Sequence, residues 1–267
     1  MSEPMRGHLA GMLAPTPPIY RYPAMVAGVR YYWIPVWDIP EGQSWPQRTL
    51  PFPHPLVVVA DSYARFYGVA SGLSGVELSG SGWAFGTAFK PSSGVHLAGG
   101  SMLDLTDRWV DLSSLHSLDG AGIVERIRSA MTPDPHVQAA HQEGIAVLEQ
   151  AFAAIPADPE GQLVDAVCEW VETTPGACRV GQICDRFGVG ERQLQRLLER
   201  RIGLTPKWLI RRRRLQEAAQ ALRVMTDVAL ADLAHELGYA DQAHFTRDFT
   251  AVVGLSPRRF RDRDHRR

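Results

Sequence analysis

Short apolar runs separated by turn-forming residues dominate the first 118 positions. Three of them are rich in β-branched and aromatic residues: VRYYWIPVWDIP (residues 29–40), PLVVVADSYARFYGVASG (55–72) and GVELSGSGWAFGTAFKP (75–91). Such a composition favours strands over helices. The runs do not alternate with helical patterns, which argues against a parallel α/β sheet. We therefore predict a compact antiparallel sheet or barrel over residues 1–118.

The pattern changes to helical spacing near residue 119. Ile123, Ile127 and Ala130 recur at the interval of a helix face, and residues 137–152 repeat apolar positions in the same way. A cluster of Pro, Asp and Gly at residues 156–161 then breaks the pattern. We predict a helical connector over residues 119–160, with a role in dimerisation left open, and short helices over residues 161–267. The expected fold class is α+β multidomain.

An internal repeat is the strongest signal in the helical part. VGQICDRFGV (residues 180–189) and LADLAHELGY (230–239) place apolar residues on the same helical face, and each helix closes at a glycine, Gly188 or Gly238. Each unit ends with nearly the same tetrapeptide, Gly-Leu-Thr-Pro at 203–206 and Gly-Leu-Ser-Pro at 254–257. Glycine ends a helix there, and Thr or Ser before Pro caps the next one.

Helix, glycine turn and helix form a helix-turn-helix unit, whose second helix enters the major groove of DNA. In the second helix of the first unit, Leu194, Leu197 and Leu198 are expected to face the core. In the second helix of the second unit, Phe245 and Phe249 are expected to do the same. Arginine suits guanine, glutamine suits adenine, and a threonine methyl contacts thymine. The outward side chains expected to contact DNA are Arg192, Gln193, Gln195 and Arg196 in the first unit, and Gln242, His244, Thr246 and Arg247 in the second.

The charge distribution agrees with a polyanionic partner for the C-terminal part. The net charge of the chain is -1. However, residues 179–267 hold 19 basic and 11 acidic residues, against 9 and 18 in residues 1–178. Such asymmetry suggests that one part meets nucleic acid, although a merely solvated basic surface would give the same count.

Residues 163–261 resemble the AraC/XylS family of bacterial transcription regulators. The most specific stretch is LADLAHELGYADQAHFTRDFTAVVGLSPRRF (230–260), and VGQICDRFGVGERQLQRLLERRIGLTPKWL (180–209) also fits. The resemblance implies that a helix over about residues 206–222 links the two units, which enter successive major grooves. It places base-reading roles on Arg192, Gln195 and Arg196 in the first unit, and on Gln242, His244, Thr246 and Arg247 in the second. Gly190 departs from the pattern, since a capping residue is usual there, so we expect a weaker start of the first recognition helix.

Four consecutive arginines, residues 211–214, fall within the linking helix. Four residues span more than one helical turn, so they cannot all face one row of phosphates. We expect some to pair with acidic neighbours and one or two to approach the DNA backbone.

The stretch 85–115 resembles a poorly characterised domain found ahead of such DNA-binding modules, which implies a cupin-like barrel. A small barrel can enclose a ligand. Trp33, Trp37, Trp83 and Phe85 are the candidates to line an apolar pocket for a small-molecule effector, with ordinary core aromatics as the alternative.

Catalytic and metal motifs are missing from the sequence. His54, His96 and His116 are scattered, and Cys168, Cys178 and Cys184 follow no ligand spacing, so we expect no metal, no cofactor and no catalytic residue. No signal peptide or long apolar run is found, which predicts a cytoplasmic protein. The partners expected are double-stranded DNA, a small-molecule effector and RNA polymerase, with monomer and homodimer both open.

Two other classes of protein remain as alternatives to a regulator. One is an enzyme that the C-terminal module docks on DNA, and the other is an interaction module whose basic helices hold a protein. The sequence does not decide between activation and repression, nor does it identify the operator.

Overall fold

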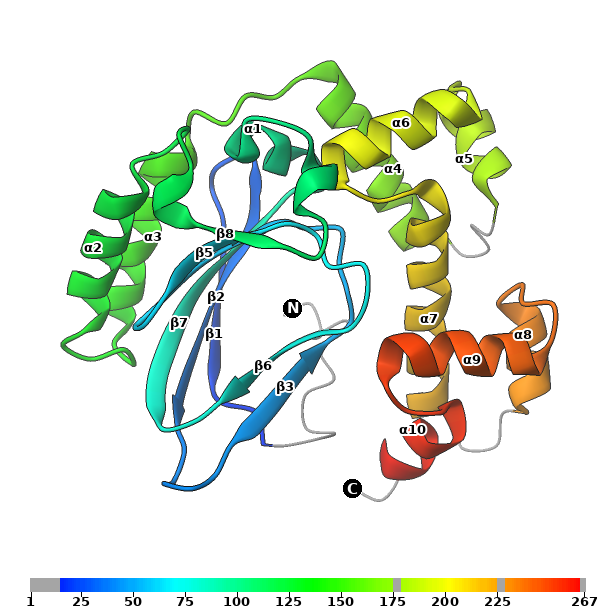
Figure 1. The fold of residues 1–267 in the computed structure, drawn as a ribbon, viewed down its shortest axis with the longest axis horizontal. Coiled ribbons are helices and arrows are strands. Elements are labelled where there is room, and N and C mark those ends of the chain that lie inside the picture. Colours follow the sequence, from blue (N-terminus) through cyan, green and yellow to red (C-terminus); the bar gives the residue numbers. More distant parts are fainter. Residues whose placement is uncertain (1–14, 175–178, 225–228, 265–267) are drawn as a thin grey trace.

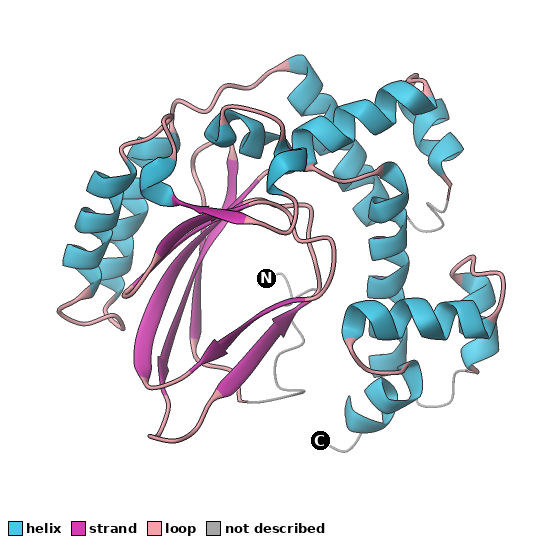
Figure 2. Ribbon diagram, viewed as in Figure 1, coloured by secondary structure: helices cyan, strands magenta, loops and turns pink. Residues whose placement is uncertain are grey.

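The computed structural model describes residues 15–174, 179–224 and 229–264. Within these residues, eight strands lie in the first part of the chain, and the helices α2 to α10 follow them (Figures 1 and 2). The expected α+β architecture, with a β-rich N-terminal part and an all-α C-terminal part, is confirmed.

An antiparallel sheet of six strands forms the N-terminal part, in the order β1-β2-β7-β4-β5-β8. The remaining strands, β3 and β6, pair with each other as a separate ribbon that lies between the main sheet and α9 in Figure 1. Among the described residues β1 and β8 are the two edges of the main sheet, so this sheet is open. The strand bounds are Ile19–Pro23 (β1), Val29–Asp38 (β2), Trp45–Thr49 (β3), Leu56–Ala60 (β4), Ala64–Tyr67 (β5), Ser74–Leu78 (β6), Ser81–Phe89 (β7) and Trp109–Asp111 (β8).

Alternation along the strands directs one set of side chains to the core under the helices. On β2, Tyr32, Ile34 and Val36 are buried there, and Phe85 and Phe89 of β7 join them. The helices α2 (Gly120–Met131) and α3 (Gln138–Phe152) cover this face and share its core through residues such as Ile127 and Phe152. The two helices expected as a connector therefore pack on the sheet.

Short helical turns connect β7 to β8 and lie beside the C-terminal helices. They are the 3-10 helix η1 (Pro91–Ser93), α1 (Gly94–Ala98) and the 3-10 helix η2 (Met102–Leu105); a further 3-10 helix, η3 (Leu112–Ser114), precedes α2. Thr106 Oγ1, just after η2, donates a 2.8 Å hydrogen bond to the carbonyl of Gly203. The N-terminal part therefore contacts the helical part directly.

Seven helices of the described residues form the C-terminal part. They are α4 (Pro159–Thr173), α5 (Val180–Phe187), α6 (Glu191–Ile202), α7 (Pro206–Val224), α8 (Leu230–Glu236), α9 (Gln242–Val253) and α10 (Pro257–Asp264). Two separate hydrophobic clusters divide them, one under α4 to α6 with the start of α7, and one under α8 to α10 with the rest of α7. Helix α7 is therefore shared by two small helical units (Figure 1). No helix of the described residues is both long and apolar enough to cross a membrane.

Candidate nucleic-acid interface

The first helix-turn-helix unit consists of α5 and α6. Gly188 ends α5 with a φ of 64°, a left-handed conformation that glycine adopts without strain. Leu194, Leu197 and Leu198 are buried on the inner face of α6, as the sequence predicts. The four side chains expected to contact DNA, Arg192, Gln193, Gln195 and Arg196, are all exposed. Gln195 Nε2 donates to Glu199 Oε1 at 3.0 Å, which uses one of the two N–H donors of the amide.

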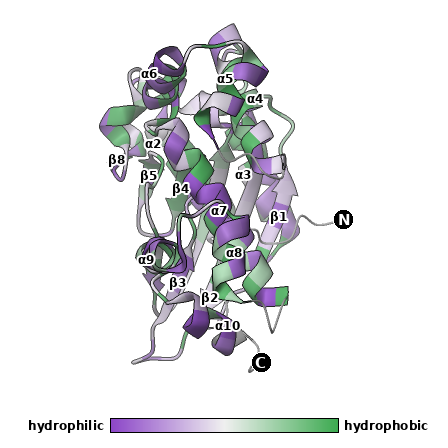
Figure 3. Ribbon diagram, turned by 90° about the vertical axis from the view of Figure 1, so that its right-hand side faces the viewer, coloured by the Kyte–Doolittle hydropathy of each residue, from purple (hydrophilic) through white to green (hydrophobic). Residues whose placement is uncertain are grey.

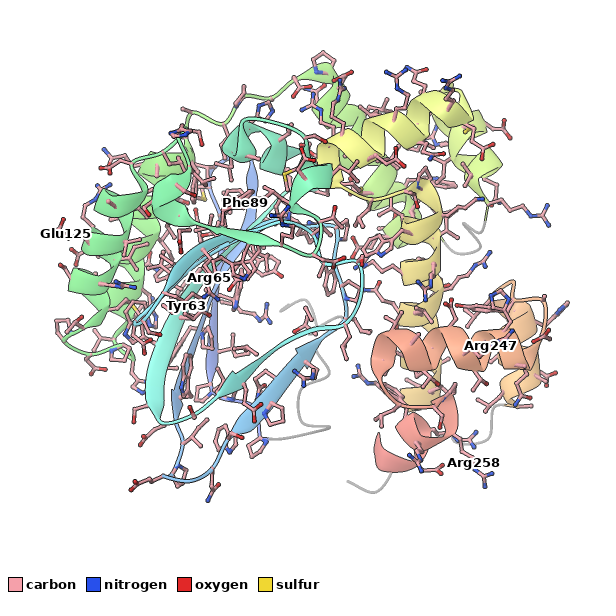
Figure 4. The ribbon with its side chains drawn as sticks, viewed as in Figure 1. Tyr63, Arg65, Phe89, Glu125, Arg247 and Arg258 are labelled. Atoms are coloured by element: carbon pink, nitrogen blue, oxygen red, sulfur yellow. The ribbon has the colours of Figure 1, made fainter. Side chains whose placement is uncertain are left out.

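Helices α8 and α9 repeat this geometry in the second unit. Gly238 makes the turn with a φ of 74°, and Phe245 and Phe249 of α9 are fully buried. Gln242, His244 and Arg247 are exposed and Thr246 is half-buried. Figure 4 shows Arg247 projecting from α9. Both second helices therefore present a polar outer face, and Figure 3 shows hydrophilic residues along α6, α7 and α10.

The second helices of the two units, α6 and α9, differ at the N-cap, the residue just before the helix begins. Asp241 caps α9, because its Oδ1 accepts a 2.7 Å hydrogen bond from the backbone N–H of His244. Gly190 occupies the same position before α6 and makes no side-chain cap. The side-chain cap is therefore absent at the start of α6, and a weaker start of this helix stays a prediction.

Each arginine of the run 211–214 in helix α7 has a protein partner. Arg211 Nε donates to Asp248 Oδ1 of α9 at 2.6 Å, and Arg213 pairs with Glu217 at 2.8 Å. Arg212 is buried and donates to the carbonyl of Pro51 at 2.6 Å, and the guanidinium of Arg214 stands 5.6 Å from the ring centroid of Tyr239. The expected pairing with acidic residues is confirmed for Arg211 and Arg213, and Arg212 Nη2 also lies 3.9 Å from Glu172 Oε1 of α4. A phosphate contact by any of the four would compete with these partners.

Asp248 connects α9 to both α7 and the turn before α9. Besides Arg211, it accepts a 2.9 Å hydrogen bond from the hydroxyl of Tyr239. Burial of the Tyr239 ring and its bond to Asp248 raise the pKa of the phenol above its usual value. Tyr239 therefore stays a neutral donor, and α9 keeps a fixed orientation on α7.

A groove of about 630 Å³ runs beside the polar face of α6. Arg192, Gln193 and Arg196 line it on one side, and Ser101 and Leu103 of the N-terminal part line it on the other. Leu103 is 53% exposed there. A molecule in this groove would therefore contact both α6 and the turn at η2.

The C-terminal end of α6 is fixed by a buried ion pair that sequence reasoning missed. Arg201 is 7% exposed and donates to both carboxylate oxygens of Asp158, which begins α4, and to Glu160 at 3.1 Å. His96 Nε2 of α1 lies 3.1 Å from Asp158 Oδ2. Burial acts to raise the pKa of Asp158, but the Gly161 N–H and the Arg201 guanidinium outweigh it and hold that pKa at about 2.

The structure does not bring the four candidate ligand-binding aromatics together. Trp83 and Phe85 lie in the core under α2 and α3, whereas Trp33 and Trp37 belong to a cluster on the opposite face of the sheet. A molecule on either face could touch only one pair. Among the described residues no group of three or more His, Cys, Asp or Glu side chains could hold a metal ion. Cys178 lies outside the described residues.

Two family models match the chain, one over each part. Residues 183–263 match a helix-turn-helix domain, and residues 22–111 match a domain of unknown function, DUF6597.

Among curated proteins, the chain is similar to a probable transcription factor, PqrA of Proteus vulgaris. The two are 31% identical over 103 residues, which is 38% of this chain and 84% of that protein. The transcriptional activator RhaS of Pectobacterium carotovorum is 30% identical over 114 residues, or 42% of this chain. The match spans only 40% of the length of RhaS.

Solved structures give weaker similarities. An AraC-type regulator from Chromobacterium violaceum is 25% identical with a TM-score of 0.34, over 39% of this chain and 91% of that one. ToxT from Vibrio cholerae is 12% identical with a TM-score of 0.39, over 92% of this chain and 97% of that one. Neither similarity assigns a ligand to this chain.

Proposed function

The chain belongs to the AraC/XylS family of transcription regulators, and we propose that it reads two short boxes of double-stranded DNA in successive major grooves. The observation that carries this proposal is the duplication itself. Two glycine-turned units, each with a buried inner face and an exposed polar face on its second helix, are held by one continuous helix. Members of this family regulate transcription and are not enzymes.

The length of α7 supports reading by both units of a single chain. Its 19 residues correspond to about 28 Å at the rise of an α-helix. One turn of DNA advances about 34 Å. We propose that α6 enters one major groove and α9 the next.

Direct base contacts are assigned to the exposed side chains of both helices. Arginine can donate two hydrogen bonds to guanine, and glutamine can pair with adenine. We assign base reading to Arg192, Gln193, Gln195, Arg196, Gln242, His244, Thr246 and Arg247. The exposed Arg258 and Arg259 of α10 would add phosphate contacts, which are strongly salt-dependent.

We also propose that the N-terminal part regulates DNA binding in response to a small-molecule effector. It contacts α6 near Thr106 and α7 through the carbonyls of Pro51 and Ser71. An effector that binds one arrangement of these contacts more tightly would change DNA occupancy. The proposed division is a sensor over residues 1–118, a connector over 119–160 and a DNA-binding part over 161–267. In this role the protein acts in the cytoplasm and meets RNA polymerase at a promoter, as a monomer or a homodimer.

Selection of bound sequences from a random DNA pool tests the proposal, with the full-length chain at fixed salt. We expect an enriched site with two short boxes about one helical turn apart. Arg196→Ala and Arg247→Ala should each weaken binding by about 1–3 kcal/mol and relax base preference at one position of one box. Glu125→Gln, on the far side of the molecule in Figure 4, is the control and should bind as the parent does.

Two outcomes of this experiment would contradict different parts of the proposal. Binding without any enriched sequence would overturn sequence-specific recognition. Equal losses on all sequences would show that the two arginines contact only phosphates.

A further inference from the structure

The second helix of each unit ends at a glycine that the N-terminal part contacts. Gly203 ends α6 and Gly254 ends α9, both with a φ of 77°. A Cβ added at Gly203 would stand 2.7 Å from the carbonyl oxygen of Met102, and one at Gly254 would stand 3.7 Å from Cδ2 of Leu73. Because the two glycines are equivalent positions of the repeat, the N-terminal part contacts the same point of both units.

The contact with the first unit combines a hydrogen bond and a buried side chain. Thr106 Oγ1, just after η2, donates to the carbonyl of Gly203 at 2.8 Å. Val69, in the loop between β5 and β6, is fully buried in the hydrophobic core of the first unit. The two interactions together fix the end of α6 on the N-terminal part.

The contact with the second unit is made by one end of the β3–β6 ribbon. Thr49 and Ser74 pair at this end. The residues just beyond that pair, Leu50 and Leu73, both join the hydrophobic core that α8, α9 and α10 form with α7. Leu50 is only 3% exposed there. This end of the ribbon is therefore part of the core of the second unit.

Asp107 connects the two contacts. It follows Thr106 directly, and its carboxylate accepts hydrogen bonds from the backbone N–H of Ser71 at 2.7 Å and from the Ser71 hydroxyl at 2.6 Å. Ser71 lies two residues before Leu73. Asp107 has a φ of 59°, a left-handed conformation that aspartate adopts more readily than most residues. A short path therefore runs through Asp107 and Ser71 from the end of α6 to the end of α9.

This path is also attached to α7, between the two units. The carbonyl of Ser71 accepts a 2.6 Å hydrogen bond from Trp208 Nε1, and the carbonyl of Pro51 accepts one of 2.6 Å from Arg212 Nε. In Figure 1 the loop between β5 and β6 lies beside α7. The cores of the two units are separate clusters, so a bend of α7 would change the angle between α6 and α9. Attachment of the N-terminal part to both units and to α7 opposes such a bend.

From these contacts we propose that a spacing brace, residues 69–73 with Thr106 and Asp107, sets the separation at which the two units read DNA. One added base pair between the boxes moves the second box by about 3.4 Å and rotates it by about 35°. A brace that holds α6 and α9 at one angle therefore selects one separation, whereas α7 alone would adapt to several. This inference rests on the proposed DNA-binding function, and the brace residues are positioning residues that act through α6 and α9.

Competition among DNA duplexes of different spacing tests the proposal with the full-length chain. The duplexes carry the two boxes found by selection from the random pool, separated by the selected spacer or by one or two base pairs more or fewer. We expect the parent to prefer one spacing by about tenfold or more over its neighbours. Asp107→Gly keeps the left-handed backbone but removes both bonds to Ser71, and should reduce this preference to about threefold or less. The base preference within each box should stay unchanged, which also shows that the variant is folded.

Two further variants separate the brace from a general effect of substitution. Asp107→Asn also accepts the left-handed backbone, and its amide can bond both the N–H and the hydroxyl of Ser71, so it should keep the spacing preference of the parent. Asp104→Ala removes an exposed carboxylate of η2 that lies outside the brace, and it should behave as the parent does.

The double variant Thr106→Val with Leu73→Ala weakens both ends of the brace and should lose the preference as Asp107→Gly does. An unchanged spacing preference in both Asp107→Gly and the double variant would overturn the proposal. So would a parent that accepts all spacings equally, or variants that bind more tightly at every spacing with the same preference. A parent that enriches two boxes while its variants keep the preference removes only the brace, whereas a parent that enriches no sequence removes the proposed function as well.

Discussion

Phe249 lies between two other phenylalanine rings in the core of the second helical unit. Its ring centroid is 5.7 Å from that of Phe245 and 5.3 Å from that of Phe260. Phe249→Ala should lower the free energy of unfolding by about 2–5 kcal/mol, because the lost contacts leave a cavity. Urea unfolding measures this change. The neighbouring Thr250 is exposed, and Thr250→Ala should change stability by about 0.5 kcal/mol or less. An unchanged transition for Phe249→Ala would contradict the core assignment.

Arg212 is a second residue whose role depends on burial. It is 5% exposed, donates to the Pro51 carbonyl and stands 4.3 Å from the ring centroid of Phe52. Burial lowers the pKa of its guanidinium to about 10, so it remains charged at neutral pH. Arg212→Leu should destabilise the chain by about 1–3 kcal/mol, because the Pro51 carbonyl loses its donor.

The matched control for Arg212 is an exposed ion pair. Arg200 bonds Glu160 at 2.6 Å, with both side chains more than half exposed, and Arg200→Leu should change stability by about 0.5 kcal/mol or less. Thermal unfolding of the two variants measures both effects. Equal small losses would show that Arg212 does not join the two parts of the chain.

The N-cap of α9, Asp241, should contribute to both stability and DNA binding. Asp241→Ala removes the hydrogen bond to the N–H of His244 and should cost about 1 kcal/mol of stability. DNA binding should weaken as well, since Gln242 and His244 lie in the first turn of α9. Asp241→Asn keeps the cap and should restore both properties. Loss of DNA binding in Asp241→Asn would instead indicate a direct role for the carboxylate.

The helices of the C-terminal part could be predicted because their signals are local. Gly188 and Gly238 end the first helices of both units with positive φ, as the sequence predicts. The inward leucines and phenylalanines of α6 and α9 follow the helical period and are buried. The linking helix, expected over about residues 206–222, is observed as Pro206–Val224.

Contacts between distant strands could not be predicted, because they depend on register. Trp33 and Trp83 both occupy strands with alternating patterns, but which face each one takes depends on how β2 pairs with β7. The pairing separates them into different clusters. In the same way, nothing local distinguishes the buried Arg212 from its three arginine neighbours. Its partner Pro51 is distant in the sequence, and only tertiary packing brings the two together.

An ion-pair cluster joins three separate parts of the chain, namely α1, the start of α4 and the end of α6. Asp158 at the start of α4 contacts Arg201 of α6 and His96 of α1. The pKa of Asp158 is lowered from 3.8 to about 2. A carboxyl whose pKa is lower in the folded state stabilises the fold above its unfolded pKa, and this contribution is lost as the pH falls through the folded value. The cluster should therefore act fully above pH 4 and weaken between pH 4 and pH 2.

The variant Asp158→Asn separates this contribution from general acid unfolding. At neutral pH it should be less stable than the parent, because the buried Arg201 loses the carboxylate of Asp158 and keeps only that of Glu160. Between pH 4 and pH 2 the difference in the free energy of unfolding should shrink, since the parent also loses the charge. Urea unfolding at a series of pH values measures this difference. A gap that stays constant down to pH 2 would mean that the charge of Asp158 does not hold α6 to the rest of the molecule, and the contact from Thr106 to Gly203 would then be the stronger connection.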